Sequence, residues 1–355
     1  MKRIIIILLT IFLLTGCYDN IELDDLSIIT GIGIDYKDDN FYLTYEILND
    51  VKTEENTALL SYTVSGSGKS ISEAFIDANY KIGKKAYFAH LKVLVLSEEI
   101  INGHFDKITD YFFRDINIRD EFNVVVANGT TPEEILKNNN DNHPVVSELI
   151  IDLLSNEKYN NSLAIDDTFQ KILSKLISNN YDIILNTISL NDEEISLNNS
   201  YIFNGYVYKN SLNKLNSKLY NMLTKNTISV EFDKNYENGN VTISVNGSKT
   251  EIDITSDKII INTKLDGKIL ENNPEFNLKD TEIYEKLNKD FGNIIKDDIN
   301  NFVKILQENN SDILGLQSIY YKKYNKENKN LWLNAKIEVN VDLKINTKGF
   351  VFEVK

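Results

Sequence analysis

A long one-sided helix followed by a strictly alternating strand limits the fold of this 355-residue chain more than any other feature. From Thr281 to Leu306, apolar residues recur at steps of three and four, which is the spacing of one face of an α-helix. From Ala335 to Ile345, every second residue is apolar, as in a strand with one buried face and one wet face. Three further strands are expected just before the helix, at Thr227–Phe232, Val241–Ile254 and Ile259–Leu265. The end of the chain therefore predicts an antiparallel-rich sheet packed by one long helix.

The first half of the chain has a different pattern, in which short strands alternate with helices. Strands are expected at Ile28–Asp35, Phe41–Ile47, Ser61–Ser65, Ala89–Leu96 and Phe122–Ala127, and helices from Ser70, at Phe105–Arg114, from Thr131, at Val145–Leu154 and at Thr168–Ile177. Two more strands, Tyr181–Leu190 and Tyr201–Tyr208, are expected on either side of a polar loop at 191–200, before a short helix at Lys214–Leu223. This alternation predicts a mixed α/β region.

Together the two patterns predict a multidomain α+β protein. It combines a mixed α/β N-terminal region with a C-terminal antiparallel-rich sheet packed by a long helix. We expect an N-terminal α/β domain at 17–190, a connecting segment at 191–228 and a C-terminal α+β domain at 229–355. Residues 1–16 are set apart from these domains because they have the pattern of a targeting signal.

The first seventeen residues have the pattern of a bacterial lipoprotein signal. Lys2 and Arg3 precede an apolar run from Ile4 to Leu14, which is too short for a membrane span of about 20 residues. The run ends in Leu14-Thr15-Gly16-Cys17, which resembles a lipobox. We therefore expect cleavage between Gly16 and Cys17, so that residues 1–16 are a lipoprotein signal peptide.

Cys17 is the only cysteine in the chain. A thiol is the side chain whose nucleophilicity suits alkylation by a diacylglyceryl group at this position. After cleavage, the new amino group of Cys17 is open to acylation as well. Two long acyl chains anchor a protein stably where one does not. The alternative is an ordinary cleaved signal in which the cysteine is incidental.

Charge and composition exclude several classes of function. The chain has 53 acidic and 38 basic residues, with a formal net charge of -15, so its surface repels nucleic acid. A single cysteine excludes an internal disulfide framework and a metal site built from several cysteines. The same composition indicates no nucleic-acid partner and no polybasic membrane patch.

The stretch TVSGSGKS, residues 63–70, resembles the end of a phosphate-binding loop. Gly68, Lys69 and Ser70 fit the pattern, but the first glycine of the motif would fall at Thr63. We therefore interpret the stretch as a glycine turn in which Ser70 caps the next helix.

A second stretch has part of a calcium-loop pattern. Asp35, Asp39 and Glu46 occupy positions 1, 5 and 12, but Lys37 takes position 3, and Asn40 stands where the loop needs glycine. Residues 37–40 are instead expected to form the turn of a β-hairpin.

The remaining polar residues do not assemble into a catalytic motif. The three histidines, His90, His104 and His143, have no metal-ligand spacing between them. The chain has no Gly-x-Ser-x-Gly elbow, and no carboxylates stand out as an acid and base pair. The sequence indicates no catalytic residue, no metal and no cofactor, and the protein is expected not to be an enzyme.

Several segments along the chain match the pattern of one known family. They are Gly16–Asp35, Ser70–Ile100, Tyr111–Leu136, Tyr201–Leu212, Ile313–Glu327 and Leu331–Gly349. These segments resemble the Ger(x)C family, the C-subunit lipoproteins of spore germinant receptors. The mature family members typically begin Gly-Cys-Trp-Asp, and Tyr18 replaces the tryptophan here.

The resemblance implies a non-catalytic subunit of a nutrient germinant receptor. It implies a lipid anchor at Cys17, on the outer face of the spore inner membrane, and assembly with integral membrane A and B subunits. Only Cys17 carries over as a functional position. Phe113, Arg114 and Asp115 match the Phe-Arg-Asp segment of the family, which has no assigned role, and Arg114 is expected in a structural ion pair.

A solute-binding lipoprotein of an importer would carry the same lipobox. Such a protein usually has two similar lobes of repeated βα units around a cleft, whereas the second half of this chain is rich in strands and has one long helix. An exported hydrolase would need a catalytic constellation that the sequence does not contain. The germinant-receptor interpretation is therefore preferred, with the solute-binding lipoprotein as the alternative.

Overall fold

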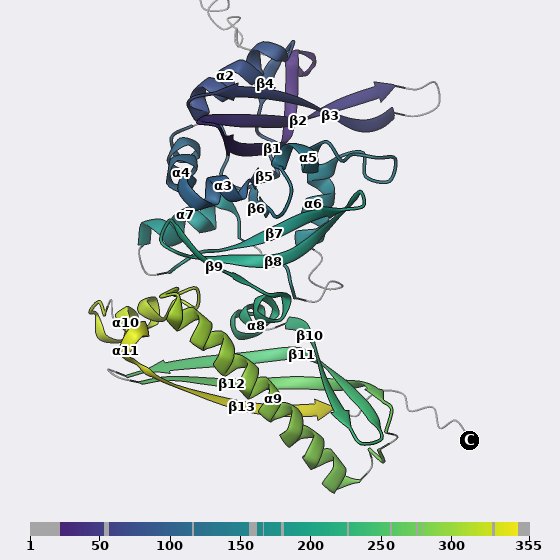
Figure 1. Ribbon diagram of the computed structural model, residues 1–355, viewed down its shortest axis with the longest axis vertical. Helices are drawn as coiled ribbons and strands as arrows, with labels where there is room; N and C mark the ends of the chain where they lie inside the picture. Colours follow the sequence, from purple (N-terminus) through teal and green to yellow (C-terminus); the bar gives the residue numbers. More distant parts are fainter. Residues whose placement is uncertain are drawn as a thin grey trace, which may run out of the picture.

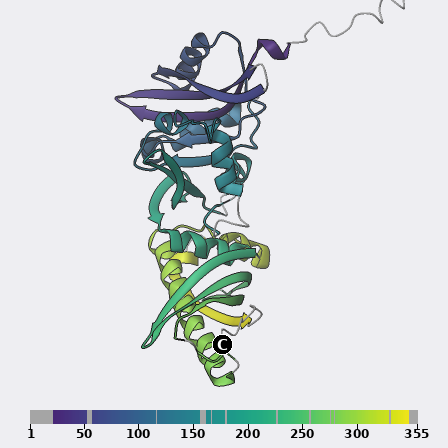
Figure 2. The ribbon, with the colours of Figure 1, turned by 90° about the vertical axis from the view of Figure 1, so that its right-hand side faces the viewer.

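The computed structural model describes residues 22–52, 57–115, 117–155, 162–165, 167–178, 181–225, 227–255, 258–274, 276–278, 280–328 and 331–346. Two bodies of secondary structure are stacked along the long axis of the molecule (Figure 1). The first is built on a nine-stranded sheet and the second on a four-stranded sheet. The first described residues lie at one end of this axis, and the four-stranded sheet lies towards the other (Figures 1 and 2).

The nine-stranded sheet is parallel in its centre and antiparallel towards both edges. Its strands are β1 (Leu26–Lys37), β2 (Asn40–Lys52), β3 (Thr57–Gly68), β4 (Lys85–Tyr87), β5 (Val93–Leu96), β6 (Asn123–Ala127), β7 (Ile184–Asn191), β8 (Glu194–Asn204) and β9 (Val207–Leu212). Their order is β3-β2-β1-β5-β6-β7-β8-β9, and the short β4 pairs with β1. Strands β8 and β9 belong to this sheet although they fall in the connecting segment expected at 191–228. The domain limits themselves stay a prediction.

Helices cover both faces of the central strands, so these strands are apolar throughout. The helices of this body are η1 (Leu23–Asp25), α2 (Ile71–Lys81), α3 (Glu98–Gly103), α4 (Phe105–Arg114), α5 (Pro132–Leu136), α6 (Val146–Ser155) and α7 (Phe169–Ser178). In β5, Leu94 and Leu96 join a core that includes Phe75 of α2 and Phe112 of α4. Val93 and Val95, on the other face, join a second core under α5 and α6. Strand β5 is shorter than the strand expected at 89–96, because residues 89 and 90 form a turn.

Two hairpins set the register of the outer strands. Asp38 and Asp39 connect β1 to β2 with φ values of 49° and 57°, as in a type I′ turn, which confirms the hairpin interpretation of the calcium-like stretch. Asp192 and Glu193 connect β7 to β8 in the same way, with φ values of 46° and 69°. The polar loop predicted at 191–200 is therefore wrong. Residues 194–200 are part of strand β8 instead, which pairing with β7 holds in place. Ile195 and Leu197 of this strand are buried in the core under α5 and α6, but the alternation of apolar and polar residues here is too weak to predict a strand.

The glycines of TVSGSGKS let helix α2 lie directly on strand β3. A Cβ on Gly66 would stand 2.4 Å from the backbone nitrogen of Ala78 and 2.5 Å from the carbonyl oxygen of Ala74. The Ser70 hydroxyl accepts a hydrogen bond from the backbone N–H of Glu73 at 3.2 Å and so caps α2. The cap at Ser70 is confirmed, whereas the expected glycine turn is wrong, because Gly66 and Gly68 lie in strand β3 and serve packing.

We expect Gly66→Ala to destabilise the protein by about 1–3 kcal/mol, because the backbone of α2 must move to admit the new methyl group. Gly83→Ala is the matched control, since a Cβ there would meet no atom within 4 Å. Urea unfolding of the chain expressed without its first seventeen residues measures both free energies. Equal stability of the two variants would contradict this account of the close approach.

A fully buried carboxylate joins four elements of the first body. Oε1 of Glu46 in β2 accepts hydrogen bonds from the Ser61 hydroxyl at 2.9 Å and the backbone N–H of Val146 at 2.6 Å. Oε2 accepts hydrogen bonds from the Thr30 hydroxyl and the backbone N–H of Ser147, each at 3.0 Å. The negative charge thereby meets the first N–H groups of α6, where the helix dipole favours it. The last residue of the calcium-like pattern is a structural anchor for this helix.

Glu46→Gln should destabilise the protein by about 2–4 kcal/mol, because either orientation of the amide places an NH₂ group against a backbone N–H donor. Glu148→Gln is the control, since Glu148 makes a partly exposed ion pair with Lys92, and such pairs contribute about 0–1 kcal/mol. The midpoints of urea unfolding compare the two. A cost for Glu46→Gln no larger than that of the control would show that the buried charge is dispensable.

The second body has the architecture that the end of the sequence predicts. Its strands are β10 (Thr227–Tyr236), β11 (Gly239–Ile254), β12 (Lys258–Asn272) and β13 (Lys336–Asn346), in the order β10-β11-β12-β13. The first three are antiparallel, and β13 pairs parallel with β12. Helix α9 (Thr281–Glu308) crosses one face of the sheet (Figure 1), and α10 (Leu316–Tyr324) and α11 (Leu331–Asn334) lie at one end of it. The α+β fold class is confirmed.

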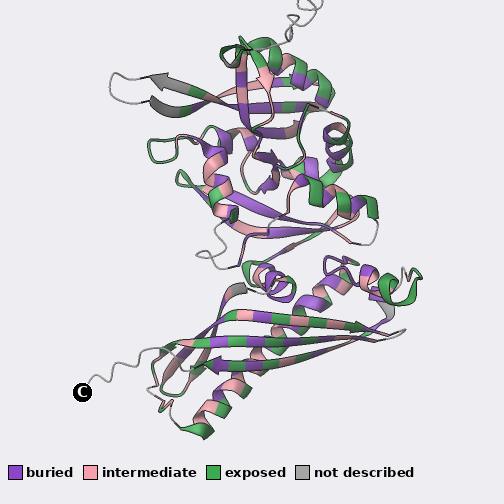
Figure 3. Cartoon of the chain, turned by 180° about the vertical axis from the view of Figure 1, so that it is seen from behind, coloured by how far each residue is buried: buried purple, intermediate pink, exposed green. Residues whose placement is uncertain are grey.

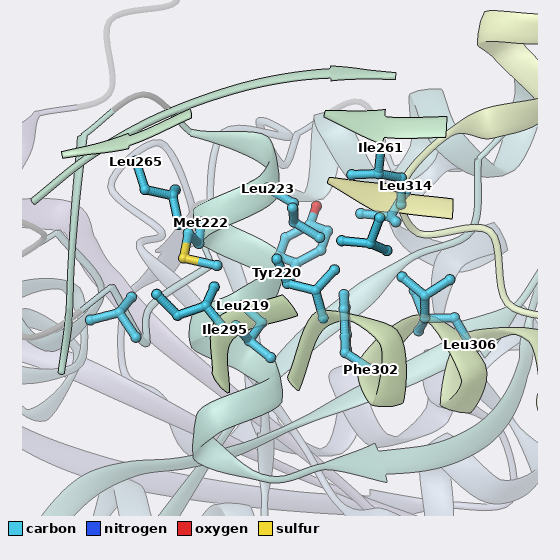
Figure 4. Close-up of a cluster of buried hydrophobic side chains, with 14 of the residues drawn as sticks. Leu219, Tyr220, Met222, Leu223, Ile261, Leu265, Ile295, Phe302, Leu306 and Leu314 are labelled. Carbon is cyan, nitrogen blue, oxygen red and sulfur yellow. The ribbon is translucent and has the colours of Figure 1, made fainter. Parts of the chain in front are cut away.

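Helix α8 (Lys214–Thr224) lies between the two sheets and shares its core with both (Figures 1 and 4). Leu219 and Met222 of α8 pack with Ile295 of α9 in the four-stranded body. The same cluster contains Ile184 of β7 and Ile202 of β8, from the nine-stranded sheet. The two bodies are therefore joined by one continuous hydrophobic core, and Figure 3 shows buried residues on the elements along the join.

Candidate functional site

The predicted lipid attachment point lies just outside the described residues. Gly16 and Cys17 precede Glu22, where the description begins, and nothing in the structure tests their chemistry. Within the described part of the chain, no helix is both long and apolar enough to cross a membrane.

The three histidines lie apart from one another and take part in local structure. The His104 ring packs on the Tyr36 ring at 3.8 Å between centroids, and its Nδ1 lies 3.3 Å from Nζ of Lys107. Burial and the Lys107 charge lower the pKa of His104. His90 lies in the turn before β5, and the backbone N–H of His143 donates to Asn140. Among the described residues, no group of three histidine, cysteine or carboxylate side chains could hold a metal ion.

The two segments that stood out in the sequence line one groove of about 610 Å³. One wall is Lys69–Ser72 at the start of α2, and another is the end of α4, with Arg114 and Asp115 of the Phe-Arg-Asp segment. Arg114 donates from Nε to both carboxylate oxygens of Asp110, each at 2.9 Å, within its own helix. This ion pair is exposed, so its contribution to stability is small. Phe113 points away from the core and is 63% exposed.

This groove is lined by charged side chains of both signs. Its cationic groups are Lys69, Lys107 and Arg114, and its carboxylates are Asp110 and Asp115. Asp115 accepts a hydrogen bond from the backbone of Asn117, and Asp110 is held by Arg114. Among the residues that line it, no hydroxyl is within hydrogen-bond distance of a base that could activate it, as a nucleophile would require.

A polar network that the sequence did not reveal lies where the central parallel strands end. Glu98 follows β5, Asn128 follows β6, and both side chains meet the Tyr201 hydroxyl of β8. Nδ2 of Asn128 donates to this hydroxyl at 2.8 Å, and burial, with the Glu98 carboxylate beside it, raises the pKa of Tyr201. Ligands of open α/β sheets often bind at this edge. In this chain the side chains of Glu98, Asn128 and Tyr201 bind one another. The network therefore connects β8 to the ends of β5 and β6.

Two carboxylates meet at the junction of the two bodies. Oδ2 of Asp182, just before β7, accepts a hydrogen bond from the backbone N–H of Asp312 at 2.6 Å. Asp312, in the turn after α9, is 1% exposed and accepts hydrogen bonds from the backbone N–H groups of Leu316 and Gln317, each at 2.8 Å. Its two oxygens thereby begin helix α10. The pair lines a pocket of about 270 Å³ at the junction.

Burial raises the pKa of both carboxyl groups of this pair. The pKa of Asp312 rises to about 7, chiefly through burial and further through the negative charge of Asp182. Burial also raises the pKa of Asp182, which the hydrogen bonds from the backbone N–H groups of Asp312 and Gly205 partly oppose. The folded protein therefore binds a proton at the junction more tightly than the unfolded chain does.

We expect this proton to appear in the pH dependence of stability. Because the pKa of Asp312 is raised on folding, the contribution of Asp312 to stability falls as the pH rises from about 4 to about 7, and Asp312→Asn lacks this contribution. The free energy of unfolding of wild type minus that of the variant should decrease by about 1–3 kcal/mol between pH 5 and pH 8. Urea unfolding at a series of pH values measures the difference.

The control for this experiment is Asp253→Asn. Asp253 is exposed, and its hydrogen bond with Lys323 lowers its pKa, so its titration is complete below pH 5. Its difference from wild type should therefore be constant over the same range. A constant difference for Asp312→Asn as well would mean that Asp312 is already ionised at pH 5.

Comparison with known proteins identifies the family of the chain. The model of the spore germination protein N-terminal domain matches residues 19–190, and that of the spore germination B3/GerAC-like C-terminal domain matches residues 198–349. The chain belongs to the Ger(x)C family. The resemblance drawn from the sequence is thereby confirmed.

Relatives of known sequence agree with this assignment. Spore germination protein B3 of Bacillus subtilis is 32% identical over 157 residues, which cover 43% of this chain and 42% of B3. Spore germination protein KC of the same organism is also 32% identical, over 38% of this chain and 35% of KC. The chain thus spans about two fifths of the length of these two relatives. Spore germination protein YndF is 23% identical over 98% of this chain and 95% of its own length.

The fold of the Ger(x)C chain matches a solved structure. The crystal structure of the GerBC protein aligns with 92% of this chain and 99% of its own, with a TM-score of 0.55 and 16% identity. At this identity the likeness shows the fold alone. The groove, the polar network and the carboxylate pair are therefore described from this chain's own residues.

Proposed function

We propose that this Ger(x)C chain is a non-catalytic, lipid-anchored subunit of a nutrient germinant receptor on the spore inner membrane. The observation that carries the proposal is the match of two spore-germination domain models over residues 19–190 and 198–349, which begins two residues after the lipobox cysteine. Cleavage after Gly16 leaves Cys17 as the diacylglyceryl-bearing first residue. The folded part then acts by assembling with the integral membrane A and B subunits on the extracytoplasmic face.

The geometry of the described residues supports a role in binding rather than catalysis. The groove beside α2 lacks a paired nucleophile and base, and the network around Tyr201 is closed by its own side chains. The Asp182–Asp312 pair is engaged with backbone N–H groups that organise the junction. In the network around Tyr201 and at the Asp182–Asp312 pair, the polar groups hold elements of the fold together.

The alternative, a solute-binding lipoprotein, is less well supported. Such proteins place a cleft between two similar lobes of repeated βα units. The described parts of this chain form a nine-stranded mixed sheet and a four-stranded sheet, whose topologies differ. A hydrophobic core joins the two bodies through α8.

Spores that carry Cys17→Ala should lose the protein from the inner-membrane fraction and germinate poorly with nutrients, because no thiol is left to receive the lipid. Thr15→Ser keeps a small residue in the lipobox and is the control, with wild-type behaviour expected. Fractionation followed by mass spectrometry of the mature N-terminal peptide measures anchoring, and the fall in optical density after nutrient addition measures germination. Normal location and normal germination of the Cys17→Ala spores would refute the anchoring role.

A further inference from the structure

The proposed anchor is separated from the folded protein by a very short linker. Residues 18–21 lie between Cys17 and Glu22, where the described chain begins. A fully extended chain spans at most about 3.6 Å per residue, so five steps reach about 18 Å. A lipid on Cys17 would therefore hold the adjoining end of the molecule close to the bilayer. We name this end the anchor pole and define it as residues 22–25, 76–81 and 84–87.

Strand pairing places these three segments together. Strand β4 runs parallel to the first residues of β1, with Lys85 opposite Leu26 and Tyr87 opposite Ile28. Helix α2 ends at Lys81, four residues before β4 begins, so the end of the helix and the start of β4 are joined by a short connection. Figure 1 shows α2 and β4 at the same end of the long axis as the first described residues. The four-stranded sheet lies towards the opposite end.

The anchor pole exposes large side chains that the fold does not use. Helix α2 buries one face, with Ala74, Phe75 and Ala78 in the core. On its outer side Tyr80 is 84% exposed and Ile76 is 50% exposed, four residues apart and hence adjacent on the helix surface. An amphipathic tyrosine ring next to an aliphatic side chain is suited to the interface between lipid headgroups and acyl chains.

Charge does not distinguish the anchor pole from the rest of the chain. Its three lysines, Lys81, Lys84 and Lys85, face four acids, Glu22, Asp24, Asp25 and Asp77, and Lys81 pairs with Asp77 at 2.8 Å. The lipid contact is therefore argued from the short linker and from the exposed Tyr80 and Ile76.

We propose that the anchor pole rests on the bilayer, with Tyr80 and Ile76 in the headgroup region and the long axis of the molecule directed away from the membrane. The nine-stranded sheet is then the membrane-proximal body, and the four-stranded sheet is held farthest from the lipid. This orientation deepens the proposed function, because it rests on the lipid at Cys17. The lipid supplies the attachment, and the pole determines which way the protein faces.

The chemistry of the chain makes the orientation directly measurable. Cys17 is the only cysteine, and its sulfur is a thioether in the lipidated protein, so Tyr80→Cys would supply the only free thiol. The lipidated full-length mature protein is reconstituted into vesicles of phosphatidylethanolamine and phosphatidylglycerol. An environment-sensitive fluorophore on position 80 is then exposed to quenchers carried on the lipid headgroups. Lys84→Cys gives a second position in the same pole.

Tyr321→Cys is the matched control. Tyr321 is an exposed tyrosine on helix α10, in the body that the proposal places away from the membrane, and it is 44% exposed. We expect quenching at positions 80 and 84 to be at least fivefold greater than at 321. Equal quenching at the two ends, or none at 80 and 84, would overturn the orientation. An unquenched position 80 that becomes protected when integral membrane proteins are added would show a protein contact in place of a lipid contact.

Failure of the anchor and failure of the orientation are separable. Vesicle flotation before any quenching shows whether the mature chain is lipid-anchored, and absence of flotation counts against the proposed function. The same labelled positions are then measured on a chain that begins at residue 18 with an N-terminal histidine tag bound to nickel-chelating lipid. With the attachment supplied in this way, quenching at 80 but not at 321 supports the pole, and the reverse refutes it.

Discussion

The buried carboxylate of Glu46 is the interaction on which the first body of this protein depends. One side chain receives hydrogen bonds from β1, β3 and the start of α6, while its own strand β2 lies between them. Isolated burial of such a charge is costly, and only a full set of donors makes it tolerable. The helix on one face of the sheet is thus fixed by the same group that fixes the register of the strands beneath it. Because β2 and β3 carry α2 on the other face, the placement of the anchor pole follows from this arrangement as well.

The junction between the two bodies also combines buried carboxylates with backbone donors, and it adds a shared hydrophobic core. Ser311 donates to the carbonyl of Phe203, and Asn204 donates to the carbonyl of Asn310 at 2.6 Å, so the end of β8 is bonded to the turn after α9. The carboxyl groups of Asp182 and Asp312 add hydrogen bonds with backbone N–H groups, and burial raises the pKa of Asp312 to about 7. Helix α8 supplies the apolar surface that both sheets share. Bodies joined by a large hydrophobic surface are not expected to move as independent domains.

The predictable parts of this fold are those in which a long period repeats in the sequence. Helix α9 and strand β13 could be placed because burial of one face imposes a regular spacing over ten or more residues. Strand β8 could not, because its polar side chains hide the alternation and its position is decided by pairing with β7. The glycine at 66 signalled a turn in sequence terms, whereas its use is to admit the backbone of α2. Glu46 could be found as a conspicuous acid, but its donors lie up to 101 residues away along the chain.

The same limit applies to function. A lipobox is local, so the anchor at Cys17 can be predicted from a few letters, and a family resemblance needs only segments in order. The surface proposed to face the membrane is different, because it combines the first described residues with the end of α2 and the start of β4, some sixty residues later. For a rigid molecule attached at one end, that surface determines how far from the bilayer every other part lies. In the proposed orientation, the protein would act through geometry, by presenting its distal sheet at a fixed height above the membrane.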